Sequence, residues 1–277
     1  MMMKKKMKRQ LHHLKILIVA LWGVLLACSG RISPDEPEDQ GFTVVNSSPA
    51  DNATNVNAGS PITISVTFSA AVDTSVIGFL MAPVPTSFTE DFTLSNEGKT
   101  AIVAAILQPN TAYTAVIYTA KDKNGNALTA PFQLSISTGS AFPSGKVQGV
   151  SRTRSAGQAI SPKGTVVGLL KIDLPQVFAL ILTGQKPLDV LRNNLAALTV
   201  VTDESGAYSI NNVVAGTYWP AAVKDVDGNA SLQPAPLGAD ALGFYDDPIS
   251  NNDSIGKEDS VRVAAGQTVT NVDIQFP

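Results

Sequence analysis

The sequence predicts an all-β protein in which two β-sandwich domains follow one another after an export segment and an acidic tether. Apolar residues alternate with polar ones at residues 62–68 and 132–136, as in strands with one buried face. Clusters of turn-forming residues recur about every ten residues, which is typical of a sandwich. A second group of strand-like segments begins near Lys163, after a stretch rich in Ser, Gly, Pro and Arg that marks a boundary.

The first segment, residues 1–27, has the architecture of a signal peptide. A basic run at residues 4–9 precedes an apolar run at residues 16–27. The apolar run is too short for a resident membrane helix, which needs about 20 residues. We therefore expect a processed export segment. The only cysteine of the chain, Cys28, comes directly after it and follows the small residue Ala27.

The residues Leu25-Leu26-Ala27-Cys28 resemble the lipobox of bacterial lipoproteins. This resemblance implies that Cys28 is the first mature residue, linked by a thioether to diacylglycerol and acylated on its new amino group. The alternative for a lone cysteine is a buried small apolar residue. Two or three acyl chains hold a protein far more firmly than one, so the expected partner of this segment is a membrane.

Removal of the export segment changes the charge and the available chemistry. Six of the 20 basic residues lie in residues 1–27 and no acid does, so 14 bases remain against 23 acids, a net charge of −9. This balance disfavours nucleic-acid binding. Both histidines, His12 and His13, also lie there. With Cys28 acylated, the sequence excludes Ser-His and Cys-His catalysis and zinc sites with His or Cys ligands.

Residues 28–41 are expected to form a tether, because they contain almost no apolar side chain to bury. Their four acids resemble the acidic surface-export signals of some Gram-negative lipoproteins, and a plain solvated spacer is the other interpretation. These acids are Asp35, Glu36, Glu38 and Asp39. Ser29 is not the aspartate that resembles an inner-membrane retention signal. We expect lipid anchoring at the outer membrane, with a periplasmic or surface-exposed chain.

Residues 42–139 are expected to form the first domain, with strands near 62–68, 102–103, 113–118 and 132–136. The segment resembles the bacterial Ig-like domain of S-layer and other surface proteins. The resemblance is carried by Leu107-x-Pro109-Asn110-Thr111-x-Tyr113, Asp122-Lys123-Asn124-Gly125-Asn126 and Ser137-Thr138-Gly139. It implies a spacer or interaction module in which Tyr113 forms a tyrosine corner. Asp122, Asn124 and Asn126 are interpreted either as oxygen ligands or as a hairpin turn, and the turn is favoured.

Residues 140–162 are expected to be a linker and residues 163–277 a second domain with its own core. Strands are expected at 164–171, 177–182 and 197–202. Between them, leucines recur at helical spacing from Leu188 to Leu198, behind Pro187, which suits a first helical turn. Either a short helix or a loop is compatible with this pattern.

The second domain resembles the carboxypeptidase regulatory-like, or transthyretin-like, β-sandwich. The matching residues are Thr202-Asp203-x-x-Gly206-x-Tyr208-x-Ile210, Gly216-Thr217-Tyr218 and, near the end, Val261-x-Val263-x-x-Gly266 with Val272-Asp273-Ile274. The resemblance implies a rigid accessory domain without peptidase residues. The segment from Asp225 to Asp259 is longer than a hairpin requires.

That segment carries eight acids against one basic residue, Lys257. Asp225-x-Asp227-x-Asn229 has the alternating oxygen spacing that Ca²⁺ uses, since this ion takes six to eight oxygen ligands. It is not an EF-hand, because Ala230 stands at the sixth position and Pro236 at the twelfth. A site would recruit Asp240, Asp246 or Asp247 from farther along. The alternatives are a calcium site and a solvated acidic loop without an ion.

The expected function is non-catalytic: a lipid-anchored cell-envelope protein that presents its Ig-like domains as a spacer, adhesion or assembly module. The alternative is a carbohydrate-binding or polysaccharide-handling accessory lipoprotein, so envelope proteins and glycans are the candidate partners. A glycosidase would need paired carboxylates in a cleft with aromatic platforms. Trp219 is the only mature tryptophan, and we expect Trp219 and Tyr218 to have packing roles. We therefore do not expect an enzyme.

Overall fold

The computed structural model describes residues 41–89, 91–185, 187–233, 238–245 and 259–276. The described residues belong to one compact unit. Cys28 and the tether at residues 28–40 therefore lie outside the described residues. No helix in the described ranges has the length and apolar character that crossing a membrane requires.

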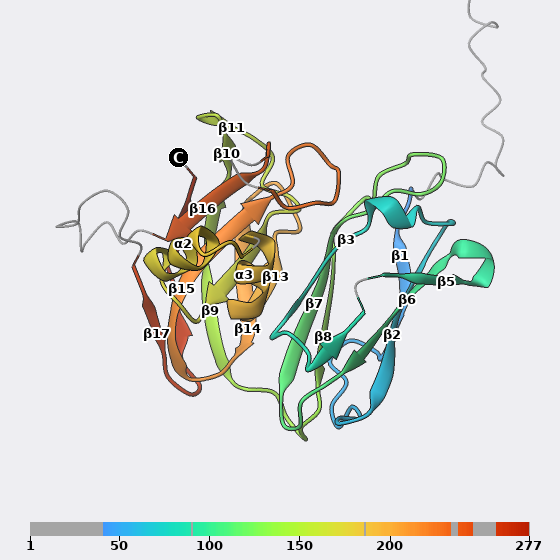
Figure 1. Cartoon of the computed structure of the whole chain (residues 1–277), viewed down its shortest axis with the longest axis horizontal. Helices are drawn as coiled ribbons and strands as arrows, with labels where there is room; N and C mark the ends of the chain where they lie inside the picture. Colours follow the sequence, from blue (N-terminus) through green and yellow to red (C-terminus); the bar gives the residue numbers. More distant parts are fainter. Residues whose placement is uncertain (1–40, 90, 186, 234–237, 246–258, 277) are drawn as a thin grey trace, which may run out of the picture. The chain divides into compact units, whose positions relative to one another are not determined.

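The first sandwich consists of two antiparallel sheets (Figure 1). One sheet has the order β1-β2-β6-β4, with β5 also paired to β6, and the other has the order β3-β7-β8. Their strands are β1 (Val44–Ser48), β2 (Pro61–Phe68), β3 (Gly78–Ala82), β4 (Ser87–Phe88), β5 (Thr93–Ser95), β6 (Thr100–Ile106), β7 (Ala112–Thr119) and β8 (Phe132–Ser137). All four strands expected in this segment are present.

The core of the first sandwich lies between these two sheets. It includes the inward side chains of β2 and β6, Ile64 and Val103, and those of β7 and β8, Tyr113 and Ile136, each no more than 3% exposed. A second cluster closes one end, where the rings of Phe42 and Phe68 stack with centroids 5.1 Å apart. The alternating apolar and polar residues of β2 thus point alternately into the core and away from it.

The second sandwich is built from nine hydrogen-bonded strands. Seven of them follow the order β13-β12-β15-β16-β19-β9-β14, and the other two, β17 and β18, pair with β15 and β9. These strands are β9 (Gly145–Arg152), β12 (Val166–Leu170), β13 (Leu195–Val200), β14 (Ala207–Val213), β15 (Gly216–Lys224), β16 (Ala241–Tyr245), β17 (Val261–Val263), β18 (Thr268–Val269) and β19 (Ile274–Gln275). A small hairpin joins β10 (Arg154–Ser155) to β11 (Gln158–Ala159). The fold is therefore all-β with two sandwiches.

Residues 140–162, for which the sequence predicts a linker, contain β9. This strand pairs with β14 on one side and with β18 and β19 on the other. Val147 is fully buried in the core of the second sandwich. The Gly, Ser and Arg residues of this segment made it resemble a linker. Gly149 is instead required within the strand, because it lets the backbone of Val272 approach closely.

Two short helices follow β12: α2 (Leu174–Leu182) and α3 (Pro187–Asn194). The strand predicted at residues 177–182 is wrong, since these residues form α2. The sequence carries a helix start that outweighs the apolar run: Asp173 Oδ1 accepts from the backbone N–H of Gln176 (2.9 Å), and Gln176 Oε1 accepts from that of Asp173 (3.3 Å), a capping box. Of the two interpretations of the following leucines, the helix that begins at Pro187 is correct.

Each sandwich has a hydrophobic core of its own, and a further hydrophobic cluster, which we call the shared core, joins the two. From the first sandwich it takes Leu80 and Ala82 on β3 and Val116 and Tyr118 on β7. From the second it takes side chains of β12, β13 and β15, the helix residues Val177 and Val190, and Leu232; the strand residues are Val166, Leu170, Leu195, Leu198, Val200, Ala221 and Val223. Strands β7, β12 and β13 are consequently buried on both faces, which explains their nearly continuous apolar sequences.

Candidate functional site

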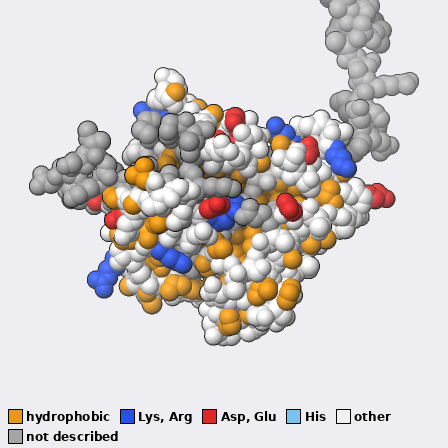
Figure 2. All heavy atoms as spheres, viewed as in Figure 1, with side chains coloured by type: hydrophobic (Ala, Val, Ile, Leu, Met, Phe, Trp, Pro, Cys, Tyr) orange, Lys and Arg blue, Asp and Glu red, His pale blue; other side chains and the backbone are white. Residues whose placement is uncertain are grey.

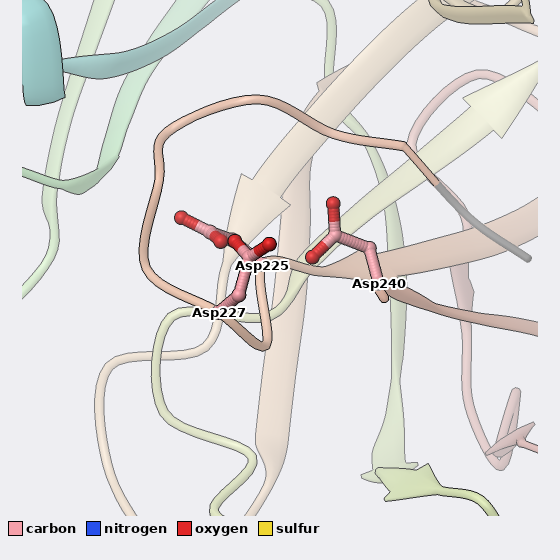
Figure 3. A group of neighbouring side chains, drawn as sticks. All are labelled: Asp225, Asp227 and Asp240. Atoms are coloured by element: carbon pink, nitrogen blue, oxygen red, sulfur yellow. The ribbon is translucent and has the colours of Figure 1, made fainter. Parts of the chain in front are cut away.

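The predicted calcium ligands Asp225, Asp227 and Asp240 come together at one end of the second sandwich (Figure 3). Asp225 directly follows β15, and Asp240 directly precedes β16. Because Lys224 pairs with Ala241 in the antiparallel ladder, the two aspartates face each other where the ladder ends. With Asp227, they bring one oxygen each within 4.8 Å of the others.

Each of these carboxylates is held by hydrogen bonds within its own loop. Asp225 accepts from the backbone N–H groups of Gly228 (2.8 Å) and Ala230 (3.1 Å). Asp240 accepts from those of Val226 (2.8 Å) and Gln233 (2.7 Å). Asp225 and Asp240 are only 7% and 4% exposed, so these bonds satisfy polar groups that water barely reaches.

Asn229 lies beside Asp227 and is hydrogen-bonded within the loop. Its side-chain nitrogen donates to Asp227 Oδ2 (2.8 Å), and its oxygen accepts from the backbone N–H of Ser231 (2.7 Å). It therefore orients Asp227. Asp246 and Asp247 lie outside the described residues.

The electrostatics of the cluster favour a cation or a proton. Burial raises the pKa of Asp225 above its ordinary value, and the neighbouring charges of Asp240 and Asp227 raise it further, while the two backbone N–H donors act in the opposite direction. Lys224 lies beside Asp225, but burial lowers its pKa, and its ammonium group donates to the backbone oxygen of Lys163. Three carboxylates at this spacing suit a hard divalent ion, which the calcium prediction requires.

The loop that carries these acids is attached to the first sandwich. The phenol of Tyr118, on β7, donates to the backbone oxygen of Ala230 (2.8 Å), and Leu232 packs into the shared core. Burial raises the pKa of Tyr118, and the charges of Asp225 and Asp240 add to the shift. The phenol therefore stays protonated and keeps donating at any ordinary pH.

Two further polar contacts connect the sandwiches. The hydroxyl of Thr199, on β13, donates to Gln133 Oε1, on β8 (2.8 Å), and the Lys163 ammonium donates to the backbone oxygen of Thr129. Thr199 is 4% exposed, so its bond is formed away from solvent. Together with the shared core, these contacts fix the loop, β7 and β8 in one arrangement.

The residues predicted to be structural have structural roles. The backbone N–H of Gln108 donates to the phenol oxygen of Tyr113 (2.8 Å), which is the expected tyrosine corner. Asp122 accepts from the backbone N–H groups of Asn124 and Asn126, around Gly125 with φ of 88°, so this segment is a turn. Tyr218 is buried in the core of the second sandwich, and Trp219 packs against the shared core.

The sequence did not reveal a polar cleft of about 440 Å³ that residues of both sandwiches line. The residues from the first are Asp51, Asn52, Gln133 and Ser135; the others are Pro143, Ser144, Gly145, Lys146, Asn211 and Asn212. A signal was present, since Asn211 and Asn212 interrupt an otherwise strand-like segment. Nothing in the sequence places them opposite Asp51, however.

The comparisons with known proteins agree with the fold of the first sandwich. A family model described as a bacterial Ig-like domain matches residues 38–138. This segment of the chain is therefore similar to bacterial Ig-like domains. A search of curated proteins finds no relative.

Among solved structures, the chain is similar to CopC from Methylosinus trichosporium OB3b, with 12% identity over 35% of this chain and 91% of that one and a TM-score of 0.28. It is similar to the N-terminal part of the bacterial S-layer protein SbsC, with 13% identity over 73% of this chain and 43% of that one and a TM-score of 0.27. For the MG0-NIE-MG1 part of Escherichia coli alpha-2-macroglobulin, the identity is 13%, the shares are 82% and 88%, and the TM-score is 0.27. At these TM-scores no functional conclusion follows.

Proposed function

We propose that this protein is a non-catalytic, lipid-anchored component of the cell envelope, held at the outer membrane through Cys28. Its two sandwiches act there as a single rigid spacer that presents an adhesion or assembly surface. Its partners are the membrane and other envelope components.

The observation that carries this proposal is the shared core between the sandwiches. Leu80 and Val116 of the first sandwich are 4% and 0% exposed among side chains of the second. Inter-domain contacts within a chain ordinarily resemble transient interfaces and permit motion, whereas a large apolar one does not. A spacer must keep its two ends at a fixed separation, and this junction supplies the stiffness.

The surface supports the same function. On the face shown in Figure 2, hydrophobic side chains reach the surface in small groups, and charged side chains are scattered among polar atoms. The match of residues 38–138 to a bacterial Ig-like domain model is a second support, because the resemblance implies a spacer or interaction module.

The rigidity is tested by measuring a distance across the junction. Spin labels on cysteines introduced at the exposed positions Thr63 in β2 and Arg262 in β17, in a Cys28→Ser background, report the separation of the sandwiches by double electron–electron resonance. We expect a distance distribution as narrow as that of a reference pair within the first sandwich, Thr63 and Thr93. A broad or bimodal distribution for the pair across the junction would contradict a rigid spacer.

The anchor is tested by fractionating cells that express the whole chain. Wild-type protein is expected in the membrane pellet, with diacylglycerol on Cys28 by mass spectrometry, because two or three acyl chains bind a bilayer firmly. Cys28→Ser is expected in the soluble fraction with an unchanged melting temperature, and Ser29→Ala is the matched control that stays in the pellet. Retention of Cys28→Ser in the pellet would remove the proposed anchor and leave the rigidity result standing.

A further inference from the structure

The polar cleft is an unusual surface because its lining is almost entirely made of hydrogen-bonding groups. Four carboxamides and two serine hydroxyls line it; the carboxamides are Asn52, Gln133, Asn211 and Asn212. The only charged side chains of the lining are one carboxylate, Asp51, and one ammonium group, Lys146, so the charges balance. Its volume of about 440 Å³ falls within the usual range of ligand sites, roughly 300–1,000 Å³.

One wall of the cleft is formed by a β-bulge. The pairing of β14 with β9 runs from Ile210 opposite Val147 to Val213 opposite Gly145, so β14 has one extra residue there. Asn212 adopts a left-handed conformation, with φ of 61°. A bulge breaks the alternation of side chains, and bulges are enriched beside functional sites for that reason. Here it lets both Asn211 and Asn212 line the cleft.

At Gly145, the strand beneath this wall packs tightly against neighbouring backbone and side-chain atoms. A Cβ atom on Gly145 would lie 2.4 Å from the backbone oxygen of Val213 and 2.8 Å from Val263 Cγ1. No side chain fits at this position. Only a glycine therefore permits the strand pairing that fixes the bulge.

The opposite wall is equally well ordered. Asp51 Oδ1 accepts from the backbone N–H of Ser135 (2.8 Å), and Asp51 Oδ2 accepts from the side chain of Asn52 (2.8 Å). Asn52 also adopts a left-handed conformation, with φ of 62°. The bond from Thr199 holds the oxygen of Gln133, which orients that amide. Because the shared core fixes both walls, the polar groups are arranged before any ligand arrives, which lowers the entropic cost of binding.

We propose that this cleft binds a neutral, hydroxyl-rich chain, a segment of a polysaccharide. The inference goes beyond the proposed spacer function and does not depend on it. A sugar hydroxyl donates and accepts at once, and a carboxamide offers a donor and an acceptor side by side, so the two groups match. Several such groups on two fixed walls can bind successive hydroxyls of a chain.

Other ligand classes fit this lining less well. An apolar ligand would leave the polar groups without partners, which costs free energy for each group. A polyanion or polycation would meet one favourable charge and one unfavourable charge, Lys146 and Asp51. A neutral polar ligand meets neither problem.

The test deletes two carboxamides without straining the backbone. Asn52→Gly with Asn212→Gly keeps both left-handed conformations, which glycine adopts readily, and removes only the side chains. The matched control is Asn55→Gly with Asn271→Gly, at φ of 55° and 62°, outside the lining of the cleft. The whole chain in a non-ionic detergent is screened on a microarray of neutral microbial and plant glycans. The best neutral polysaccharide is then used in affinity gel electrophoresis beside anionic polygalacturonate.

We expect retardation by at least one neutral polysaccharide, no retardation by polygalacturonate, and a Kd raised about tenfold or more in the Asn52→Gly, Asn212→Gly variant. Tenfold corresponds to about 1.4 kcal/mol, which two lost hydrogen bonds account for. The control should bind like the wild type. Three results would overturn the inference: no neutral glycan bound, retention by polygalacturonate alone, or equal affinity in the cleft variant and the control. None of them affects the distance and fractionation results that test the spacer.

Discussion

At the scale of single residues, Tyr118 connects the two halves of the protein most directly. Its ring is 7% exposed within the shared core, and its hydroxyl donates to the backbone oxygen of Ala230, in the acidic loop. One side chain thus contributes apolar packing and a hydrogen bond to the same junction. The loop that carries Asp225 and Asp240 is ordered partly from outside its own sandwich.

We predict that Tyr118→Phe lowers the free energy of unfolding by about 1–3 kcal/mol, since it leaves the oxygen of Ala230 without its donor. Hydrogen exchange should also become faster at residues 226–233. Tyr218→Phe is the matched control, because its hydroxyl donates to Val214 within the second sandwich. It should lower stability and leave exchange in the loop unchanged. Equal exchange in the loop of Tyr118→Phe and the wild type would show that the phenol does not hold the loop.

The same tyrosine gives a pH dependence with a definite sign. Burial raises the pKa of Tyr118 above its ordinary value, so the unfolded chain loses the phenol proton first as the pH rises. The contribution to stability is therefore complete below about pH 10 and is lost above it. Chemical denaturation between pH 8 and pH 11, roughly, should show the wild type losing more stability than Tyr118→Phe.

Gly149 is a second residue whose identity the packing dictates. A Cβ atom there would lie 1.9 Å from the backbone oxygen of Val272, which cannot move aside as a flexible side chain can. We predict that Gly149→Ala destabilises the protein by about 3 kcal/mol or more. At Gly139 the nearest atoms would be 3.5 Å away and φ is not positive, so Gly139→Ala should change stability by less than about 1 kcal/mol. Similar melting temperatures for the two variants would contradict this account.

Residue roles that depend on near neighbours could be predicted from the sequence, and distant ones could not. The corner at Tyr113 joins residues five apart, and the turn at Asp122 spans four, so their sequence patterns contain the whole interaction. The bond from Tyr118 to Ala230 joins residues 112 apart. No local pattern indicates such a contact.

At the scale of elements, strands buried on both faces account for what the sequence concealed. The apolar runs of β7, β12 and β13 predicted strands correctly. They did not show what covers the second face of each strand, because that face packs against residues far away in the sequence. The run at residues 177–182 is equally apolar and forms a helix. Apolar composition alone does not separate the two, and the capping pair Asp173 and Gln176 decides it.

The acidic loop shows how far spacing can predict a site. Asp225 and Asp227 are close in sequence, so their proximity was expected, and the register of β15 with β16 then adds Asp240. The spacing also suggested Asn229, whose side-chain nitrogen donates to Asp227 Oδ2 and so orients that carboxylate. Whether the loop binds calcium stays a prediction.

We predict that Ca²⁺ raises the melting temperature, because a cation would offset both the burial and the neighbouring negative charges that raise the pKa of Asp225. At 100 times the Kd the gain is about 2.7 kcal/mol, or roughly 5–10 °C for a chain of this size. Without the ion, the raised pKa of Asp225 makes the folded protein bind its proton more tightly than the unfolded chain does, so acidification should stabilise the loop. Asp225→Asn should abolish the response to Ca²⁺.

The matched control for this titration is Asp203→Asn, which changes an exposed aspartate in a turn outside the cluster and should leave the response to Ca²⁺ intact. Calorimetry gives the second measurement. No heat and no rise in melting temperature at millimolar Ca²⁺ would leave the loop as a solvated acidic turn, held by its own backbone N–H donors.

At the scale of the whole molecule, the main consequence of the shared core is cooperativity. Two sandwiches with separate cores and nothing more would unfold independently, and the sequence predicted that arrangement because the mature chain is long enough for two domains. In the structure, the outer faces of β3 and β7 pack against those of β12, β13 and β15. Burial of this surface makes the folding of each half depend on the other.

Two adjacent residues of β3 belong to different cores and so allow the effects of the two cores to be compared. Leu80 belongs to the shared core and is 4% exposed, and Met81 belongs to the core of the first sandwich and is 3% exposed. Truncating either residue to alanine removes a similar volume and should cost about 2–5 kcal/mol. Leu80 also borders a small apolar cavity of about 40 Å³, which its removal would enlarge.

We predict that the wild type unfolds in one calorimetric transition and that Leu80→Ala splits it into two, because the sandwiches lose part of the surface that couples them. Met81→Ala should lower the melting temperature and keep a single transition, since the coupling surface is intact. Tryptophan fluorescence of Trp219, which packs against the shared core, should follow the transition of the second sandwich. If the wild type already unfolds in two transitions, or if Met81→Ala splits the transition as Leu80→Ala does, the shared core does not couple the sandwiches, and a rigid spacer loses its physical basis.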